Sequence, residues 1–197
     1  MKNFKTAALT GALALAGLPA LAATYDIDPA HSTIGFKIRH MMVSKVAGTF
    51  GKYTGTFDYD PKDPKAWAAK AAIETASVDT RNEKRDGHLK SPDFFDVEKF
   101  PSMEFVSTGI KGWKGGKGKL MGKLTLHGVT KDVALDLELV GAAKDPGGNE
   151  RAGFTATTTI NRKDYGVSWN KAMEAGGVML SEEVWISIEV EGVKKKS

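Results

Sequence analysis

The sequence predicts an all-β domain, either an up-and-down barrel or a sandwich of about eight strands. Apolar and polar residues alternate in successive short runs, which is typical of antiparallel strands with one buried and one solvated face. Turn residues separate the runs, as in Asp60–Pro64, Gly112–Gly118 and Asp145–Asn149. The chain shows no internal repeat and no low-complexity linker, so one domain is expected over residues 23–197.

The expected strands follow one another along the chain. In order, their alternating residues are Ile34, Phe36 and Ile38; Tyr53, Gly55 and Phe57; Ala69, Ala71 and Ile73; Met103 and Phe105; Leu120, Gly122, Leu124 and Leu126; Val133, Leu135, Leu137 and Leu139; Phe154, Ala156, Thr158 and Ile160; and Val184, Ile186, Ile188 and Val190. Small residues between large ones leave two interpretations open, a filled tapering core or a cavity for one small ligand. A cavity with this apolar lining would take a hydrocarbon chain.

The first 22 residues have the layout of a secretory signal peptide. Lys2 and Lys5 precede an apolar stretch over residues 7–18, and Ala20–Ala22 forms a small-x-small cleavage site. The apolar stretch is short for a membrane span, which disfavours the alternative of an uncleaved anchor. We therefore expect cleavage after Ala22 and a periplasmic mature protein if the source is Gram-negative.

The composition excludes several classes of chemistry. The sequence contains no cysteine, which rules out a disulfide framework, a thiol nucleophile and thiolate-ligated metal sites. The four histidines, at positions 31, 40, 88 and 127, lack the spacing of a metal site, so no metal is expected. No nucleophile elbow or phosphate-binding loop is present, and the net charge of +4 is too small to indicate nucleic-acid binding.

The connection Asp79–Pro101 breaks the alternation and is long for a compact domain, which is typical of a functional loop. Thr80–Glu83 has the pattern of a capping box and predicts a polar helix over residues 81–90. Ser91–Pro92 predicts the start of a second helical turn that carries two phenylalanines. Two interpretations stay open: a lid over an open end of the barrel, or a crossover that plugs its core.

A lysine-rich hairpin is expected over Lys111–Lys123. It carries five lysines and Trp113, and no acid lies between Glu104 and Asp132. Such a hairpin could approach an anionic membrane surface transiently. The favoured alternative is a solvated hairpin protected from aggregation by its lysines. The oligomeric state is left open between a monomer and a homodimer.

Several motifs along the chain carry a family resemblance. They are Asp28-x-x-His31-Ser32, Ser77-x-Asp79-Thr80, Arg85-Asp86-x-His88-Leu89-x-Ser91, Phe94-Phe95-Asp96-Val97, Phe100-Pro101-x-Met103-x-Phe105-x-Ser107, Leu124-x-x-His127-Gly128-Val129-Thr130 and Ile160-Asn161-Arg162-x-Asp164-Tyr165-Gly166. Together they resemble the YceI-like family of periplasmic polyisoprenoid-binding proteins over essentially the whole mature chain. The one departure is Tyr165, where phenylalanine is frequent.

The resemblance implies an eight-stranded antiparallel, lipocalin-like barrel with a short helical lid segment and an apolar tunnel for a long prenyl chain. It implies no enzyme activity and no cofactor other than a bound polyisoprenoid, such as a quinone tail or another prenyl lipid. The residues expected along the chain are Phe36, Ile38, Phe57, Phe105, Leu124, Phe154 and Trp185, with Phe94 and Phe95 closing one end. The candidates for the polar head, for which a purely structural role stays equally open, are Arg85, Asp86, His88 and Arg162.

The expected function is therefore non-catalytic binding, storage or transport of a polyisoprenoid in the periplasm. Burial of a hydrocarbon contributes about 0.8 kcal/mol per CH₂, so a long prenyl tail binds tightly without any catalytic residue. Two alternatives remain. One is an enzyme that acts on an isoprenoid head group, with His88 and Asp86 as acid and base, and the other is a stress-related barrel with a filled core.

Overall fold

The computed structural model describes residues 22–174 and 176–196, so the predicted signal peptide lies outside the described residues except for Ala22. The elements in chain order are β1 (Ala23–Ile27), β2 (Thr33–His40), β3 (Ser44–Phe50), β4 (Tyr53–Tyr59), β5 (Ala68–Glu74), β6 (Val78–Asp79), α1 (Glu83–Lys90), β7 (Ser102–Lys114), β8 (Lys117–Leu126), β9 (Val129–Lys144), β10 (Glu150–Asn161) and β11 (Leu180–Lys194). Short 3₁₀ turns cover Pro29–His31, Pro64–Ala66, Thr75–Ser77 and Arg162–Tyr165. Within the described ranges, no helix is long and apolar enough to cross a membrane.

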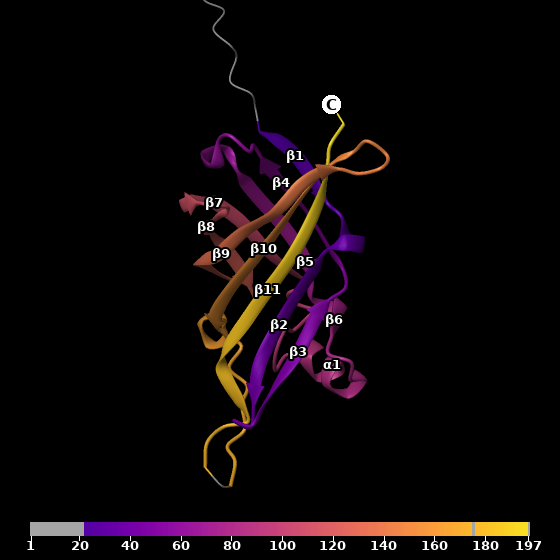
Figure 1. Cartoon of the computed structure of the whole chain (residues 1–197). Coiled ribbons are helices and arrows are strands. Elements are labelled where there is room, and N and C mark those ends of the chain that lie inside the picture. The colour runs from indigo at the N-terminus through magenta and orange to yellow at the C-terminus, as the bar shows by residue number, and fades with distance from the viewer. Residues whose placement is uncertain (1–21, 175, 197) are drawn as a thin grey trace, which may run out of the picture.

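The strands close into a barrel (Figure 1). The sheet runs β1-β4-β5-β7-β8-β9-β10-β11, and β11 returns to β1, where Tyr25 lies opposite Lys194. Further along, β11 also pairs with β2, and β2 pairs with β3, which in turn pairs with β6. In three places, two consecutive strands share one position in the barrel wall: β1 with β2, β3 with β4, and β5 with β6. Eleven strands therefore form an eight-stranded barrel. The expected eight-stranded antiparallel barrel is confirmed.

The alternation in the sequence matches the two faces of the barrel wall. In β10, Phe154 and Ala156 are buried, while Thr157 between the inward positions is exposed. Every strand expected from the alternation lies within a strand of the structure. The sequence did not predict β1, β3 or the two-residue β6. The strand β3 was missed because Gly48 replaces a side chain in its inward row. A Cβ at Gly48 would lie 2.5 Å from the ring of Phe36, so the close approach of β2 and β3 needs a glycine there.

The long connection forms one helix rather than two. The N-cap is Asn82, whose side chain accepts a hydrogen bond from the Arg85 amide, so the predicted capping box at Thr80 is wrong. Thr80 is instead buried and bonded to Asp86. The second helical turn is also absent, because Ser91 caps the C-terminal end of α1 and its carbonyl accepts a bond from the Phe94 amide in a tight turn.

Two apolar clusters pack inside the barrel. The aromatic cluster, at the end of the barrel where β1 begins, is built around Phe57, Tyr59, Trp67 and Phe154. The second cluster lies under the α1 segment and includes Phe50, Ile73, Met103, Leu126 and Tyr165, with Leu89 and Phe95 of the long connection packed against it. The long connection therefore covers the barrel interior on the side of the second cluster.

Candidate ligand-binding cavity

A cavity of about 420 Å³ lies inside the barrel, within the range of small-ligand sites. Its wall is almost wholly apolar and draws on residues of nearly every strand and of the long connection. Inward-facing side chains such as Leu124, Ile186 and Ile188 line it and remain only half-buried, because open space adjoins them. The interior is therefore not completely filled by side chains, unlike the filled-core alternative.

Most residues expected along the ligand chain lie in the cavity wall. They are Phe36, Ile38, Phe57, Phe105, Leu124 and Phe154, together with Phe94 and Phe95. Trp185 does not, and its expected place in the tunnel is wrong. Because Val184 and Ile186 point inward, the side chain between them points outward, where the Lys45 ammonium lies 4.5 Å from the Trp185 ring.

Three rings meet at one end of the cavity. The Trp169 ring lies 5.2 Å from the ring of Phe94 and 4.9 Å from that of His88, and all three residues border the cavity. Phe95 instead packs edge-on against Phe50, at 5.6 Å between ring centroids. The α1 segment and the segment that follows β10 thus meet through side chains across this end, in the manner of a lid.

Arg85 and Asp86 hold the lid segment to the barrel. The Asp86 carboxylate accepts bonds from the amide and the hydroxyl of Thr80, at 2.9 and 2.5 Å. Arg85 donates to the hydroxyl and the carbonyl of the same threonine, both at 2.7 Å. Arg85 borders the cavity but Asp86 does not, so the carboxylate has a structural position.

Arg162 is the one charged side chain among the buried residues of the described ranges, with 3% of its surface exposed. Its guanidinium donates to the main-chain carbonyls of Ser181, Val167 and Trp169, at 2.7 to 2.9 Å. Burial lowers the pKa of Arg162, and its Nη2 has no acceptor within the described residues. The residue borders the cavity, so it both anchors the Trp169 segment and retains one unused donor.

The acid–base pair required by the enzyme alternative is not formed. The His88 Nε2 atom bonds to Asp93 at 2.8 Å, whereas Asp86 is bonded to Thr80. The side chains of His88 and Asp93 are 42% and 50% exposed, although His88 also borders the cavity. The geometry therefore gives His88 a place at the cavity end but does not pair it with Asp86.

The lysines of the expected basic hairpin are largely paired. Three of them, on β8, form ion pairs with acids of the neighbouring β9, namely Lys117 with Glu138, Lys119 with Asp136 and Lys123 with Asp132. Trp113 is also not an exposed tip, because its ring packs 4.6 Å from Trp67. Contact of this hairpin with a membrane stays a prediction, and the pairing weakens its basis.

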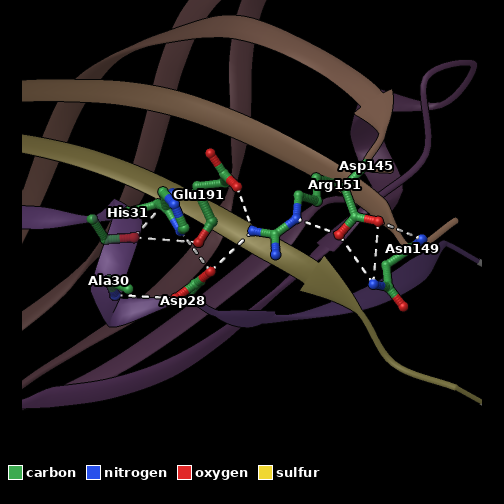
Figure 2. A network of polar contacts seen from close by, with 8 residues as sticks. Asp28, Ala30, His31, Asp145, Asn149, Arg151 and Glu191 are labelled. Atoms are coloured by element: carbon green, nitrogen blue, oxygen red, sulfur yellow. Dashed lines mark hydrogen bonds and ion pairs between the residues drawn. The ribbon is translucent and has the colours of Figure 1, made fainter. Parts of the chain in front are cut away.

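A polar cluster outside the cavity joins distant parts of the chain (Figure 2). The Arg151 guanidinium bonds to Asp28, Asp145 and Glu191. Bonds from His31 and Arg151 lower the pKa of Asp28 to about 2. Asp28, His31 and Glu191 have metal-ligand spacing, but the guanidinium already lies between the two carboxylates and supplies the compensating cation.

Sequence reasoning missed the part of the wall that comes from irregular chain. Val167 and Met179 border the cavity but lie between β10 and β11, where no periodicity marks them as inward-facing. Val46 and Phe50 were missed with β3. Trp169 lies in the same irregular segment; the size of its ring predicts a place in the core or the cavity wall, and it does border the cavity.

Comparison with known proteins shows that the chain belongs to the YceI-like family. Residues 25–192 match the YceI-like domain. A UPF0312 protein of Shewanella sp. strain MR-7 is 42% identical over 197 residues, which cover 99% of this chain and 100% of that protein. The Campylobacter jejuni YCEI protein, a crystal structure, has 37% identity and a TM-score of 0.70 and covers 86% of this chain and 96% of that chain. A polyisoprenoid binding domain from Saccharophagus degradans shares the fold, with 16% identity, a TM-score of 0.66, and coverage of 88% of this chain and 99% of that chain.

Proposed function

Because the chain belongs to the YceI-like family, we propose that its barrel binds one long-chain polyisoprenoid without catalysing a reaction. The observation that carries the proposal is the apolar cavity of about 420 Å³. A prenyl chain matches such a wall because each buried CH₂ contributes about 0.8 kcal/mol. The name of the Saccharophagus degradans domain, which has the same fold, adds support for this class of ligand.

The position of the lid suggests how the ligand is oriented in the cavity. Aromatic rings fill the end of the barrel near β1, whereas the lid covers the other end through the Trp169, Phe94 and His88 contacts and the contact of Phe95 with Phe50. The prenyl chain would lie along the aliphatic wall, with its polar head near the lid. There Arg85, His88 and Arg162 border the cavity and carry donors. A quinone or another carbonyl-bearing head would accept such hydrogen bonds.

The proposal places the mature protein in the periplasm as a carrier or reservoir. Its support is the signal-peptide pattern that ends at Ala22. A water-insoluble chain cannot cross an aqueous compartment unless its apolar surface is covered. The intact mass of protein taken from a periplasmic fraction would establish cleavage after Ala22, and an uncleaved cytoplasmic product would contradict this part of the proposal.

Mass spectrometry of an organic extract tests the ligand. Protein purified without detergent should release a prenyl compound in about one-to-one ratio, because one cavity holds one chain. Two matched variants place the ligand. Thr158→Phe adds a ring on the inward face of β10, while Thr157→Phe adds the same ring to its exposed face. The first should lose the lipid and the second should keep it; equal retention by both would contradict a ligand inside the barrel.

His88→Ala separates the carrier from an enzyme that acts on the head group. A carrier should retain its lipid in the variant, with at most a modest change in affinity, because the apolar wall supplies most of the binding. An enzyme that uses His88 should show a reaction product in the extract of wild-type protein and unchanged substrate in the extract of the variant. Appearance of such a product would overturn the non-catalytic proposal.

A further inference from the structure

The turn between β2 and β3 exposes a small apolar surface at the end of the barrel opposite the C-terminus (Figure 1). We call it the apolar tip; it consists of Met41, Met42, Val43 and the neighbouring Val178. Val43 is 84% exposed. The Met41 amide donates to the Met179 carbonyl at 2.7 Å, so the turn and the segment before β11 are joined. Isolated exposed apolar residues are common, but adjacent ones on two joined segments indicate a contact surface.

The backbone conformation of the β2–β3 turn is unfavourable for methionine, the residue at both of its central positions. Met41 and Met42 have φ values of 50° and 62°, and the Val43 amide closes the turn on the His40 carbonyl. Tight hairpin turns with two positive φ values favour asparagine and glycine. Two other hairpins of the barrel follow that preference, with Gly115–Gly116 between β7 and β8 and a glycine after His127 between β8 and β9. The methionines are thus unfavourable for the turn itself, which points to a role in contact with a partner.

Two cations that lack a carboxylate partner among the residues described flank the apolar tip, and one of them, Lys45, lies over the Trp185 ring. Residues 29–57 contain no aspartate or glutamate, and Arg39 and Lys45 face each other across the hairpin. Within the described residues, neither has a carboxylate at ion-pair distance. The charges of Lys171 and Glu174 on the adjoining loop cancel, and on β11 Glu182 is paired with Lys163. Glu183, in the irregular part of β11 beside Arg39, offsets part of the positive charge and leaves the border net positive. An apolar surface with a basic border is complementary to an anionic phospholipid surface.

The apolar tip also lies beside the cavity. His40, Met179 and Leu180 border the cavity, and they adjoin the tip along the chain. We propose that the apolar tip and its flanking cations dock the protein on an anionic phospholipid bilayer, with the lid end of the cavity turned toward the lipid. This inference rests on the proposed function for its purpose, because a prenyl chain must leave and enter a bilayer without crossing water. It assigns membrane contact to the β2–β3 turn rather than to the lysine hairpin of β7 and β8.

Flotation with vesicles tests the docking. The vesicles contain equal parts of phosphatidylglycerol and phosphatidylethanolamine, and phosphatidylcholine vesicles serve as the neutral comparison. Wild-type protein should bind the anionic vesicles and lose binding in high salt. The double variant Arg39→Gln/Lys45→Gln should weaken binding more than about tenfold, since each cation near such a surface contributes roughly fivefold. Met42→Ser/Val43→Ser should weaken it to a similar extent of about tenfold through lost apolar burial.

Two controls match these variants. Val140→Ser removes an apolar side chain that is 69% exposed on β9, and Lys119→Gln/Lys123→Gln neutralises two lysines of the paired hairpin. Both should bind vesicles within about twofold of wild type if the tip is the docking site. Loss of binding in the lysine control, with the tip variants unaffected, would overturn the proposal. Absence of vesicle binding by the wild-type protein would also overturn the proposal. This includes the case in which gel filtration shows that the tip mediates self-association instead.

Lipid content of each variant keeps this proposal separate from the proposed function. Tip variants that retain extracted prenyl lipid but lose vesicle binding support docking as a step distinct from ligand binding. If the wild-type protein yields prenyl lipid in the extract but does not bind vesicles, the docking proposal is contradicted and the proposed carrier function is not. Vesicle binding by protein that never yields prenyl lipid contradicts the carrier instead. All the substituted side chains are exposed, and circular dichroism of each variant should match that of wild type.

Discussion

The two ends of the barrel interior are built from the same strands but packed differently. Near β1, Phe154 lies 5.4 Å from Phe57, 5.5 Å from Tyr59 and 5.4 Å from Trp67, measured between ring centroids. Toward the lid, half-buried aliphatic side chains such as Ile186 border open space. Side-chain size along shared strands, rather than a change of fold, thus closes one end of the cavity with packed rings and leaves open space along the aliphatic wall toward the lid.

The largest expected contrast concerns stability. Phe154→Ala should lower the free energy of unfolding by about 3–5 kcal/mol, because it removes a ring in contact with three others. Both residues border the cavity, but Phe36 is only half-buried and contacts one ring, that of Phe50, so Phe36→Ala should cost only about 1–2 kcal/mol. Urea unfolding of lipid-free protein measures both. If both variants lost the same free energy of unfolding, the two ends of the barrel would be equally packed, which would contradict the difference described above.

The next contrast concerns the lid. Trp169→Ala should speed release of a bound prenyl lipid about tenfold, because it removes two aromatic contacts that close the cavity. Trp185→Ala removes the same side chain from the outer face of β11 and should leave the release rate unchanged. Transfer of a fluorescent prenyl probe to acceptor vesicles gives both rates. A similar rate in wild type and Trp169→Ala would show that the ligand does not leave through the lid.

The smallest effect is expected far from the cavity, at the cluster of Figure 2. The folded-state pKa of Asp28, about 2, lies below its ordinary value of 3.8, so its ionised form stabilises the fold. That contribution is fully present above about pH 4 and disappears as the pH falls toward 2. Asp28→Asn should therefore lower the Tm at pH 6 by a few degrees. As the pH falls toward 2, the Tm of the variant should decrease less than the Tm of the wild-type protein. Parallel Tm curves for the two proteins from pH 6 to pH 2 would contradict this role.

Alternation made most of the barrel predictable. Runs such as Val184–Val190 mark inward positions because successive side chains of a strand point to opposite faces. The same rule places Trp185 outside, so its expected role in the tunnel conflicted with the pattern of its own strand. Closure through β1 and β11 was implied by the family resemblance, because pairing between the two ends of a chain leaves no local signal.

The lid shows where sequence reasoning failed and why. Thr80 fits a capping box, but its hydroxyl is used by Arg85 and Asp86, and Asn82 caps the helix instead. Side-chain competition of this kind depends on tertiary contacts that a local motif does not contain. Trp169 borders the cavity from irregular chain held by Arg162, so no periodicity could indicate it.

Affinity measured against prenyl chain length tests the central claim most directly. Lipid-free protein is titrated with prenyl alcohols of increasing length, and the quenching of tryptophan fluorescence reports binding. Affinity should rise at least about tenfold with each added isoprene unit until the cavity is full, and then level off. Thr158→Phe should level off at a shorter chain, whereas Thr157→Phe should follow wild type. Affinity that does not depend on chain length would contradict an apolar cavity that holds the prenyl chain.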